Sequence, residues 1–141
     1  MRATLLNTFI VFAITLFTQS CGSDAKPTST TSCQTGSALI HVLDASLTSL
    51  CGCSEGVVNT VQGQDFTCTV SKGTVVTFKF DGAQLQHQIT PVTAKAFLQS
   101  DVFDPQDSST IVNHSVTFSS SGTFSFKDKY NPSLAGSIIV P

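Results

Sequence analysis

Hydrophobic and polar residues alternate along much of the chain between residues 38 and 140. The clearest case is residues 74–80, where Val76, Phe78 and Phe80 fall on one face of an extended strand. Other short runs with strand-like composition lie at residues 39–43, 66–70, 86–92, 115–118, 123–126 and 135–140. Roughly seven short strands with frequent turns are typical of a Greek-key β-sandwich, so the predicted fold class is all-β.

Two stretches depart from this pattern. Residues 44–64 carry the sequence Cys51-Gly52-Cys53 and several turn residues, so we expect a disulfide-tied loop there, with room for one helical turn at residues 45–50. Residues 94–105 are mixed in character and are predicted to be a loop with a helical turn. Residues 119–122 are turn-like, and the strands on either side of them are predicted to form a hairpin.

The N-terminus has the features of an export signal. Its apolar stretch, residues 5–17, is shorter than the roughly 20 apolar residues of a membrane-spanning helix. The stretch is followed by Cys21 in a context that resembles the processing site of bacterial lipoproteins, although Thr18 stands where an aliphatic residue is usual. We predict a signal peptide at residues 1–20 and lipidation of Cys21, with ordinary cleavage near the same place as the alternative.

The next segment is predicted to be a tether. Residues 21–37 contain the lipidated cysteine and a run rich in Thr and Ser with little apolar content, which is typical of a flexible spacer. The folded domain is predicted at residues 38–141. Together these features predict an exported protein of the bacterial cell envelope, held at a membrane through a lipid anchor and facing the periplasm or the exterior.

The five cysteines support export. If Cys21 carries lipid, an even number remains for disulfides in an oxidising compartment. A bond between Cys51 and Cys53 would close a very tight ring, so each is expected to pair with Cys33 or Cys68, in either combination. The alternative is that Cys51 and Cys53 form a metal or redox site, but such motifs usually have two intervening residues.

Composition argues against several classes of function. Charged residues make up 11% of the chain and the net charge is -2, with no basic stripe, so nucleic acid is not a predicted partner. The chain has a single Glu, no nucleophile motif with ordered Ser, His and Asp, and no glycine loop that could bind phosphate. We therefore predict that the protein is not an enzyme.

Three segments together resemble the cupredoxin family, which includes the plastocyanin- and azurin-like proteins. Residues 122–140 (GTFSFKDKYNPSLAGSIIV) are similar to its C-terminal strand, copper-ligand loop and last strand. Residues 69–80 (TVSKGTVVTFKF) resemble its V-x-x-G-x-x-V-x-F strand pair, and residues 86–90 (QHQIT) resemble the P-H-x-V-T segment that carries the first histidine ligand. The resemblance covers about residues 66–140 and implies a cupredoxin-like sandwich.

The same resemblance implies that the type 1 copper site is degenerate. It places His87 at the first histidine ligand, Asp128 at the cysteine, Asn131 at the second histidine and Leu134 at the methionine. A blue copper centre needs two imidazoles and a thiolate with a weak axial thioether, so only His87 keeps its ligand type. His87 is thus a candidate metal ligand, a rim histidine with local hydrogen bonds, or the partner of Asp128 in an ion pair.

Two other groups of potential ligands are interpreted as ordinary residues. The histidines could share a copper or zinc site, but they lie far apart in sequence, at His41, His87 and His114. Regularly spaced acids could suggest calcium, but the ligand-rich loop with a glycine is missing around Asp101, Asp104 and Asp107.

These observations predict a non-catalytic envelope lipoprotein that uses the sandwich as a binding or structural module for an unknown protein or small molecule. The predicted contact loop is residues 127–134, which begins at Lys127 and contains the sole tyrosine, Tyr130. Tyr130 could instead cap the core. No cofactor is predicted; the alternative functions are copper binding for electron transfer or copper handling, and storage of a divalent metal through His87 and Asp128.

Overall fold

The computed structural model describes residues 33–56, 59–61 and 63–141. The predicted signal peptide, Cys21 and most of the predicted tether lie outside these residues. Within them, no helix has the length and apolar character needed to span a bilayer.

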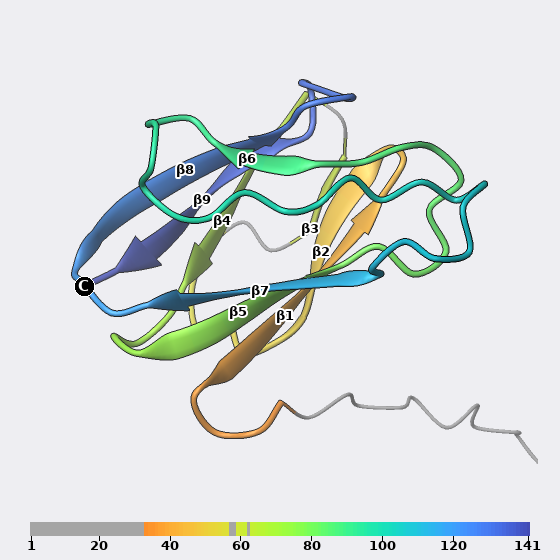
Figure 1. The fold of residues 1–141 in the computed structure, drawn as a ribbon. Helices are drawn as coiled ribbons and strands as arrows, with labels where there is room; N and C mark the ends of the chain where they lie inside the picture. The colour runs from red at the N-terminus through yellow and green to blue at the C-terminus, as the bar shows by residue number, and fades with distance from the viewer. Residues whose placement is uncertain (1–32, 57–58, 62) are drawn as a thin grey trace, which may run out of the picture.

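The described residues form nine strands in two sheets that pack face to face (Figure 1). The first sheet has the order β3 (Asn59–Val61), β2 (Ser46–Cys51), β1 (Ser37–Leu43), β5 (Thr74–Lys79) and β7 (Asn113–Phe118). The second has the order β4 (Asp65–Thr69), β9 (Ala135–Val140), β8 (Gly122–Asp128) and β6 (Ile89–Pro91). The β1–β5 and β4–β9 pairs are parallel and the others are antiparallel. The predicted all-β sandwich is confirmed.

The core lies between the sheets and follows the predicted alternation. Along β5 and just beyond it, Val76, Phe78 and Phe80 are buried. The ring of Phe78 meets that of Phe126, on the opposite sheet, edge to face with centroids 5.1 Å apart. Burying a large apolar side chain contributes on the order of 1.5–3 kcal/mol, so this aromatic layer is a principal source of stability.

The interpretation of residues 44–64 as an irregular loop was wrong, because β2 and β3 lie within it. Ala45 lies between β1 and β2 in a two-residue turn, and β2 then pairs antiparallel with β1. Leu47 is the only fully buried side chain of β2, and the following Thr48 and Ser49 are partly exposed. One apolar residue among hydroxyl side chains produces no visible alternation, although Thr suits a strand well.

The predicted hairpin around residues 119–122 is also wrong. β7 pairs with β5 in the first sheet, whereas β8 pairs with β9 and β6 in the second. The connection therefore crosses from one sheet to the other, and the rings of Phe118 and Phe124 pack across it with centroids 4.9 Å apart. Residues 94–105, for which a helical turn was expected, contain no helix.

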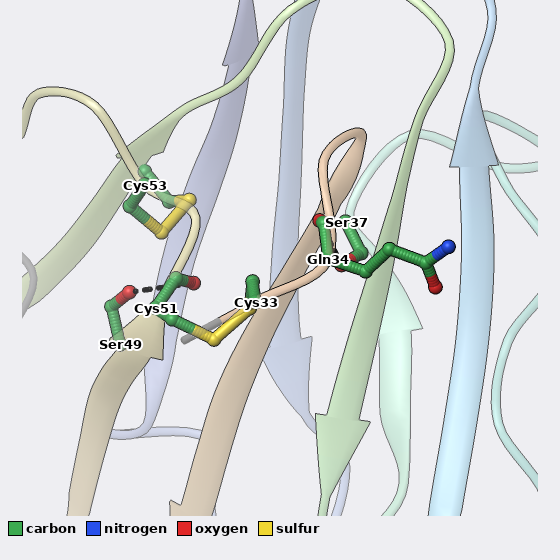
Figure 2. The surroundings of a disulfide bond; sticks show 7 residues. Cys33, Gln34, Ser37, Ser49, Cys51 and Cys53 are labelled. Atoms are coloured by element: carbon green, nitrogen blue, oxygen red, sulfur yellow. Dashed lines mark hydrogen bonds between the residues drawn. A yellow bond between two sulfur atoms is a disulfide. The ribbon is translucent and has the colours of Figure 1, made fainter. Parts of the chain in front are cut away.

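Both closely spaced cysteines form disulfides with distant partners. Cys33 is bonded to Cys51, as Figure 2 shows, and Cys53 is bonded to Cys68. The Cα atoms of the two pairs lie 5.5 and 5.1 Å apart. This pairing resolves the two combinations left open by the sequence, and it makes the metal or redox interpretation of Cys51 and Cys53 wrong.

Gly52 explains why these two cysteines are separated by a glycine. Its backbone has a left-handed conformation (φ +84°), and a Cβ added there would lie 2.3 Å from the carbonyl oxygen of Ser37. The chain therefore passes directly over the start of β1, where no side chain fits. Gly73, in the turn between β4 and β5, has nearly the same φ (+86°) but nothing within 4 Å of an added Cβ.

This pair of glycines gives a matched test. Gly73→Ala should lower the free energy of unfolding by about 1 kcal/mol, the cost of a left-handed conformation for a residue with a Cβ. Gly52→Ala adds a backbone clash and should cost roughly 1–3 kcal/mol more. Urea denaturation of both variants with the disulfides intact measures the difference. Equal losses would show that the close approach at Gly52 does not occur.

Candidate functional site

Three strand ends bring polar residues together at one end of the sandwich. Asp44 directly follows β1, Asp128 is the last residue of β8, and His87 lies just before β6. The backbone of His87 is held by two hydrogen bonds with Phe103, of 3.0 and 2.9 Å. Asp128 stands opposite Ile89 in the β6–β8 pair, so the sheet register places its side chain beside His87.

The imidazole of His87 is bound on both sides by carboxylates. Its Nδ1 lies 2.5 Å from Oδ2 of Asp128, and its Nε2 lies 3.1 Å from Oδ1 of Asp44. His87 and Asp128 are fully buried, whereas the side chain of Asp44 is 33% exposed. Ionised carboxylates only accept hydrogen bonds, so both ring nitrogens donate and the ring is an imidazolium. The pair of His87 and Asp128 considered from the sequence is thus present, with Asp44 as a third member.

The carboxylates also organise the neighbouring loops. Oδ1 of Asp128 accepts hydrogen bonds from the backbone N–H groups of Tyr130 (2.8 Å) and Asn131 (3.1 Å). Oδ1 of Asp44 accepts from the backbone N–H groups of Gln84 (2.9 Å) and Leu85 (3.0 Å). Each carboxylate therefore holds one loop as well as the imidazolium. We call Asp44, His87 and Asp128 the carboxylate–imidazolium cluster.

Two phenylalanine rings shield the cluster. The ring of His87 is roughly parallel to that of Phe80, with centroids 6.1 Å apart, and to that of Phe103, at 6.4 Å. Phe80 and Phe103 in turn stack on each other at 5.5 Å. The faces of aromatic rings attract a cation, and these rings also keep water from the imidazolium.

The surroundings shift two pKa values in opposite directions. Burial alone would lower the pKa of His87, but the hydrogen bonds and negative charges of Asp128 and Asp44 outweigh it and raise the pKa. Partial burial would raise the pKa of Asp44, but the hydrogen bond with His87 and the two backbone N–H groups lower it. Both shifts favour the charged forms.

The other residues singled out from the copper resemblance have structural contacts. Nδ2 of Asn131 donates to the backbone oxygen of Asp44 at 2.6 Å, and Oδ1 of Asn131 accepts from Ser133 at 2.7 Å. Leu134 is 1% exposed and belongs to the core. Neither side chain presents a donor atom to His87.

The predicted contact loop is exposed. Lys127 points to solvent at the end of β8, and Tyr130 is 47% exposed, with Nζ of Lys129 5.6 Å from the centroid of its ring. The suggestion that Tyr130 caps the core is therefore wrong.

Asp44 is the functional-site residue that sequence reasoning missed. It belongs to none of the three family-like segments, and in sequence it is one acid at the start of a polar turn. Its role depends on the pairing of β1 with β5, which brings the end of β1 next to Phe80 and hence to His87. The only local signal was a carboxylate directly after a short apolar run, which is too common to be diagnostic.

The other candidate ligands do not join the cluster. His41 contacts the backbone oxygen of Asp81, and His114 contacts that of Leu98. Asp104 and Asp107 accept hydrogen bonds from nearby backbone N–H groups. Within the part of the chain that the structure describes, no group of three or more His, Cys, Asp or Glu side chains is placed to hold a metal ion.

Comparison with known proteins identifies the fold. No family model and no curated protein matches the sequence. A reduced amicyanin variant aligns over 77% of this chain and 86% of its own, with a TM-score of 0.51 and 15% identity, and the Cu(I) form of another amicyanin variant gives the same values. A purple cupredoxin from Nitrosopumilus maritimus aligns over 53% of this chain and 77% of its own, with 18% identity and a TM-score of 0.44, too low to support an inference. The protein has a cupredoxin fold.

The cluster makes stability depend on pH. The folded pKa of His87 is raised above its unfolded value near 6.5. Its contribution to the free energy of unfolding is therefore fully present below pH 6.5 and is lost as the pH rises through the folded pKa. The folded pKa of Asp44 is lowered from 3.8, so its contribution is present above pH 3.8 and is lost as the pH falls through the lowered value.

We therefore expect the free energy of unfolding to fall above pH 6.5 in the native protein and to fall less in His87→Gln, which removes the titrating group. His41→Gln and His114→Gln are controls and should retain the native profile. Urea denaturation at a series of pH values measures this. A native profile that is flat, or that rises, on the alkaline side would contradict the charged cluster.

Proposed function

We propose that this protein is a non-catalytic, cupredoxin-fold binding or structural module of the bacterial cell envelope, anchored through lipid on Cys21. The observation that carries the proposal is the buried bond between His87 and Asp128, at the end of the sandwich where the resemblance puts the copper site. There an internal ion pair links the loops in place of a metal ion. The functional part is then the surface that these linked loops present.

The donor set does not fit type 1 copper. Nδ1 of His87 is engaged by Asp128 and Nε2 by Asp44, so the imidazolium offers no lone pair to a metal. Asp128 supplies a hard carboxylate at the position of the thiolate, and thiolate is the ligand that keeps Cu(I) accessible. Asn131 is already hydrogen-bonded and Leu134 has no donor atom. A metal would have to displace a proton and break both carboxylate contacts.

The linked loops present exposed apolar side chains. Leu85 is 58% exposed and Tyr130 is 47% exposed, and they lie on the two loops whose backbone N–H groups bind Asp44 and Asp128. A partly apolar side chain held on a rigid loop is a typical contact residue, because little conformational entropy is lost on binding. We call Leu85 together with residues 127–134 the loop-end surface.

The path of the chain supports an orientation of this surface. The disulfide between Cys33 and Cys51 fixes the start of the described chain at one end of β1, and Asp44 lies at the other end. A strand of seven residues is about 23 Å long, so the two ends are well separated. With an anchor at Cys21, the loop-end surface would face away from the membrane and toward a partner.

Copper titration tests the metal-free assignment. The full-length chain should show no thiolate-to-copper absorption band and no bound copper that depends on His87. Visible absorption and native mass spectrometry measure this, with His41→Ala and His114→Ala as controls for weak binding at the other histidines. One equivalent of copper that is lost in His87→Ala and kept in both controls would instead favour the alternative, a copper-binding protein of electron transfer or copper handling.

Crosslinking in envelope extracts tests the loop-end surface. The double variant Leu85→Ser, Tyr130→Ser should recover a specific partner at least roughly tenfold less well than the native chain, because buried contact residues contribute on the order of 2 kcal/mol each. Val75→Ser and Val92→Ser, at exposed apolar positions outside this surface, are matched controls. A partner recovered equally by all three variants would rule out this surface as the contact.

A further inference from the structure

Asp128 binds the imidazolium and its own loop through separate oxygen atoms. Its Oδ2 contacts Nδ1 of His87, whereas its Oδ1 accepts hydrogen bonds from the backbone N–H groups of Tyr130 and Asn131. The backbone N–H of Asp128 also donates to the carbonyl of Leu134 at 2.8 Å, across the base of this loop. A change at the far ring nitrogen, Nε2, therefore leaves the bonds that fold this loop intact.

Asp44, by contrast, binds the imidazolium and a loop through a single oxygen atom. Its Oδ1 lies 3.1 Å from Nε2 of His87 and also accepts from the backbone N–H groups of Gln84 and Leu85. The main chain of Asp44 is held separately, since its carbonyl oxygen accepts from Nδ2 of Asn131. The carboxylate can therefore turn away from the ring while the backbone stays, and such a turn removes the acceptor of both N–H groups.

The two ring nitrogens of His87 differ in how readily they lose a proton. A neutral imidazole keeps one N–H, and its other nitrogen becomes an acceptor. Asp128 is fully buried, so loss of the proton from Nδ1 would leave it as an unpaired charge out of reach of water. The side chain of Asp44 is 33% exposed, so water can replace the contact that it loses. The proton should therefore leave Nε2, whose lone pair then faces Oδ1 of Asp44 and repels it.

The other two elements packed against the ring of His87 present aromatic rings, those of Phe80 and Phe103. The charged neighbours of these phenylalanines are bonded elsewhere: Nζ of Lys79 to Oδ2 of Asp81 at 3.1 Å, and Oδ2 of Asp104 to Nε2 of Gln86 at 2.7 Å. The charges that face the ring are thus those of Asp128 and Asp44. Burial lowers the pKa of His87, and these two carboxylates outweigh it.

We propose that His87 is a pH switch within the loop-end surface: loss of its Nε2 proton releases residues 82–86 first, while residues 128–131 keep their position. Leu85, which is 58% exposed, would lose its rigid support, and Tyr130 would keep it. The consequence for binding rests on the proposed function, because it assigns a pH dependence to the same surface. A partner that contacts both side chains would bind less well at alkaline pH, since a mobile contact residue must be ordered on binding.

Backbone amide exchange of the ¹⁵N-labelled full-length chain tests the release without a partner. Between a pH below 6.5 and the pH at which His87 is neutral, the protection factors of Gln84 and Leu85 should fall at least roughly tenfold. Those of Tyr130 and Asn131 should change less than about twofold. The ¹⁵N chemical shifts of the ring should show a neutral form that is protonated at Nδ1.

Asp44→Asn is the matched variant. Its amide oxygen still accepts from the two N–H groups but carries no charge, and its NH₂ group can donate to a bare Nε2. Protection of Gln84 and Leu85 should then stay within about twofold over the same pH range, although His87 still titrates. His114→Gln is the control and should behave like the native chain, because His114 contacts a backbone oxygen outside the cluster.

The switch would be overturned by equal loss of protection in both loops, by a neutral ring protonated at Nε2, or by a ring that stays charged until the protein unfolds. Recovery of a crosslinked partner at the two pH values then tests the effect on binding. It should fall at least about threefold at the alkaline pH for the native chain and not for Asp44→Asn. Equal recovery would overturn the control of binding. Failure to recover any partner at either pH would contradict the proposed function alone, because the release is measured on the isolated chain.

Discussion

The buried contact between His87 and Asp128 constrains the whole loop end of this protein. Removing a carboxylate and an imidazolium from water costs several kcal/mol per ion, and this desolvation cost is offset only if both ions are well paired. Here the pairing is complete, because Asp44 binds the second ring nitrogen and backbone N–H groups bind the carboxylates. Loss of one carboxylate would leave a buried charge without its partner, a change that typically costs about 3–5 kcal/mol. The positions of three loops therefore depend on a single proton being retained on His87.

The two ends of the sandwich are linked by different chemistry. At the end where β2 and β4 finish, the disulfides of Cys51 and Cys53 join segments that the strand pairing alone would leave separate. At the other end, the carboxylate–imidazolium cluster joins the segments after β1, before β6 and after β8. The disulfide bonds do not titrate, whereas the charges that hold the cluster together depend on pH. The opposite pKa shifts of His87 and Asp44 widen the pH range in which both of these groups are charged.

Sequence predicted the parts of this structure that are encoded locally. Alternation identified β5, and three short motifs predicted the sandwich and placed His87 near Asp128. Prediction from the sequence failed where the structure depends on pairing between strands that are distant in sequence. The strands β7 and β8 are close in sequence and look like a hairpin, but the inward faces of Phe118 and Phe124 meet across the core, which puts the strands in different sheets. Asp44 and β2 were missed for the same reason. The roles of a single acid and of a single buried leucine, Leu47, become clear only when the neighbours of β1 in the fold are known.

The low charge of the chain affects how its edge strands are protected. Proteins commonly protect edge strands with charged side chains, especially lysine, but only 11% of this chain is charged and β7 carries no Lys, Asp or Glu. The other edges are instead protected by short length, by Pro91, or by a backbone segment held through the disulfide of Cys53. Protection is thus achieved by geometry at these three edges, and at β7 residues 96–98 lie beside the strand, with the ring of Phe97 packed on that of Phe118. Edge protection by geometry is what a chain with so few charged residues requires, because charged side chains are scarce at every edge.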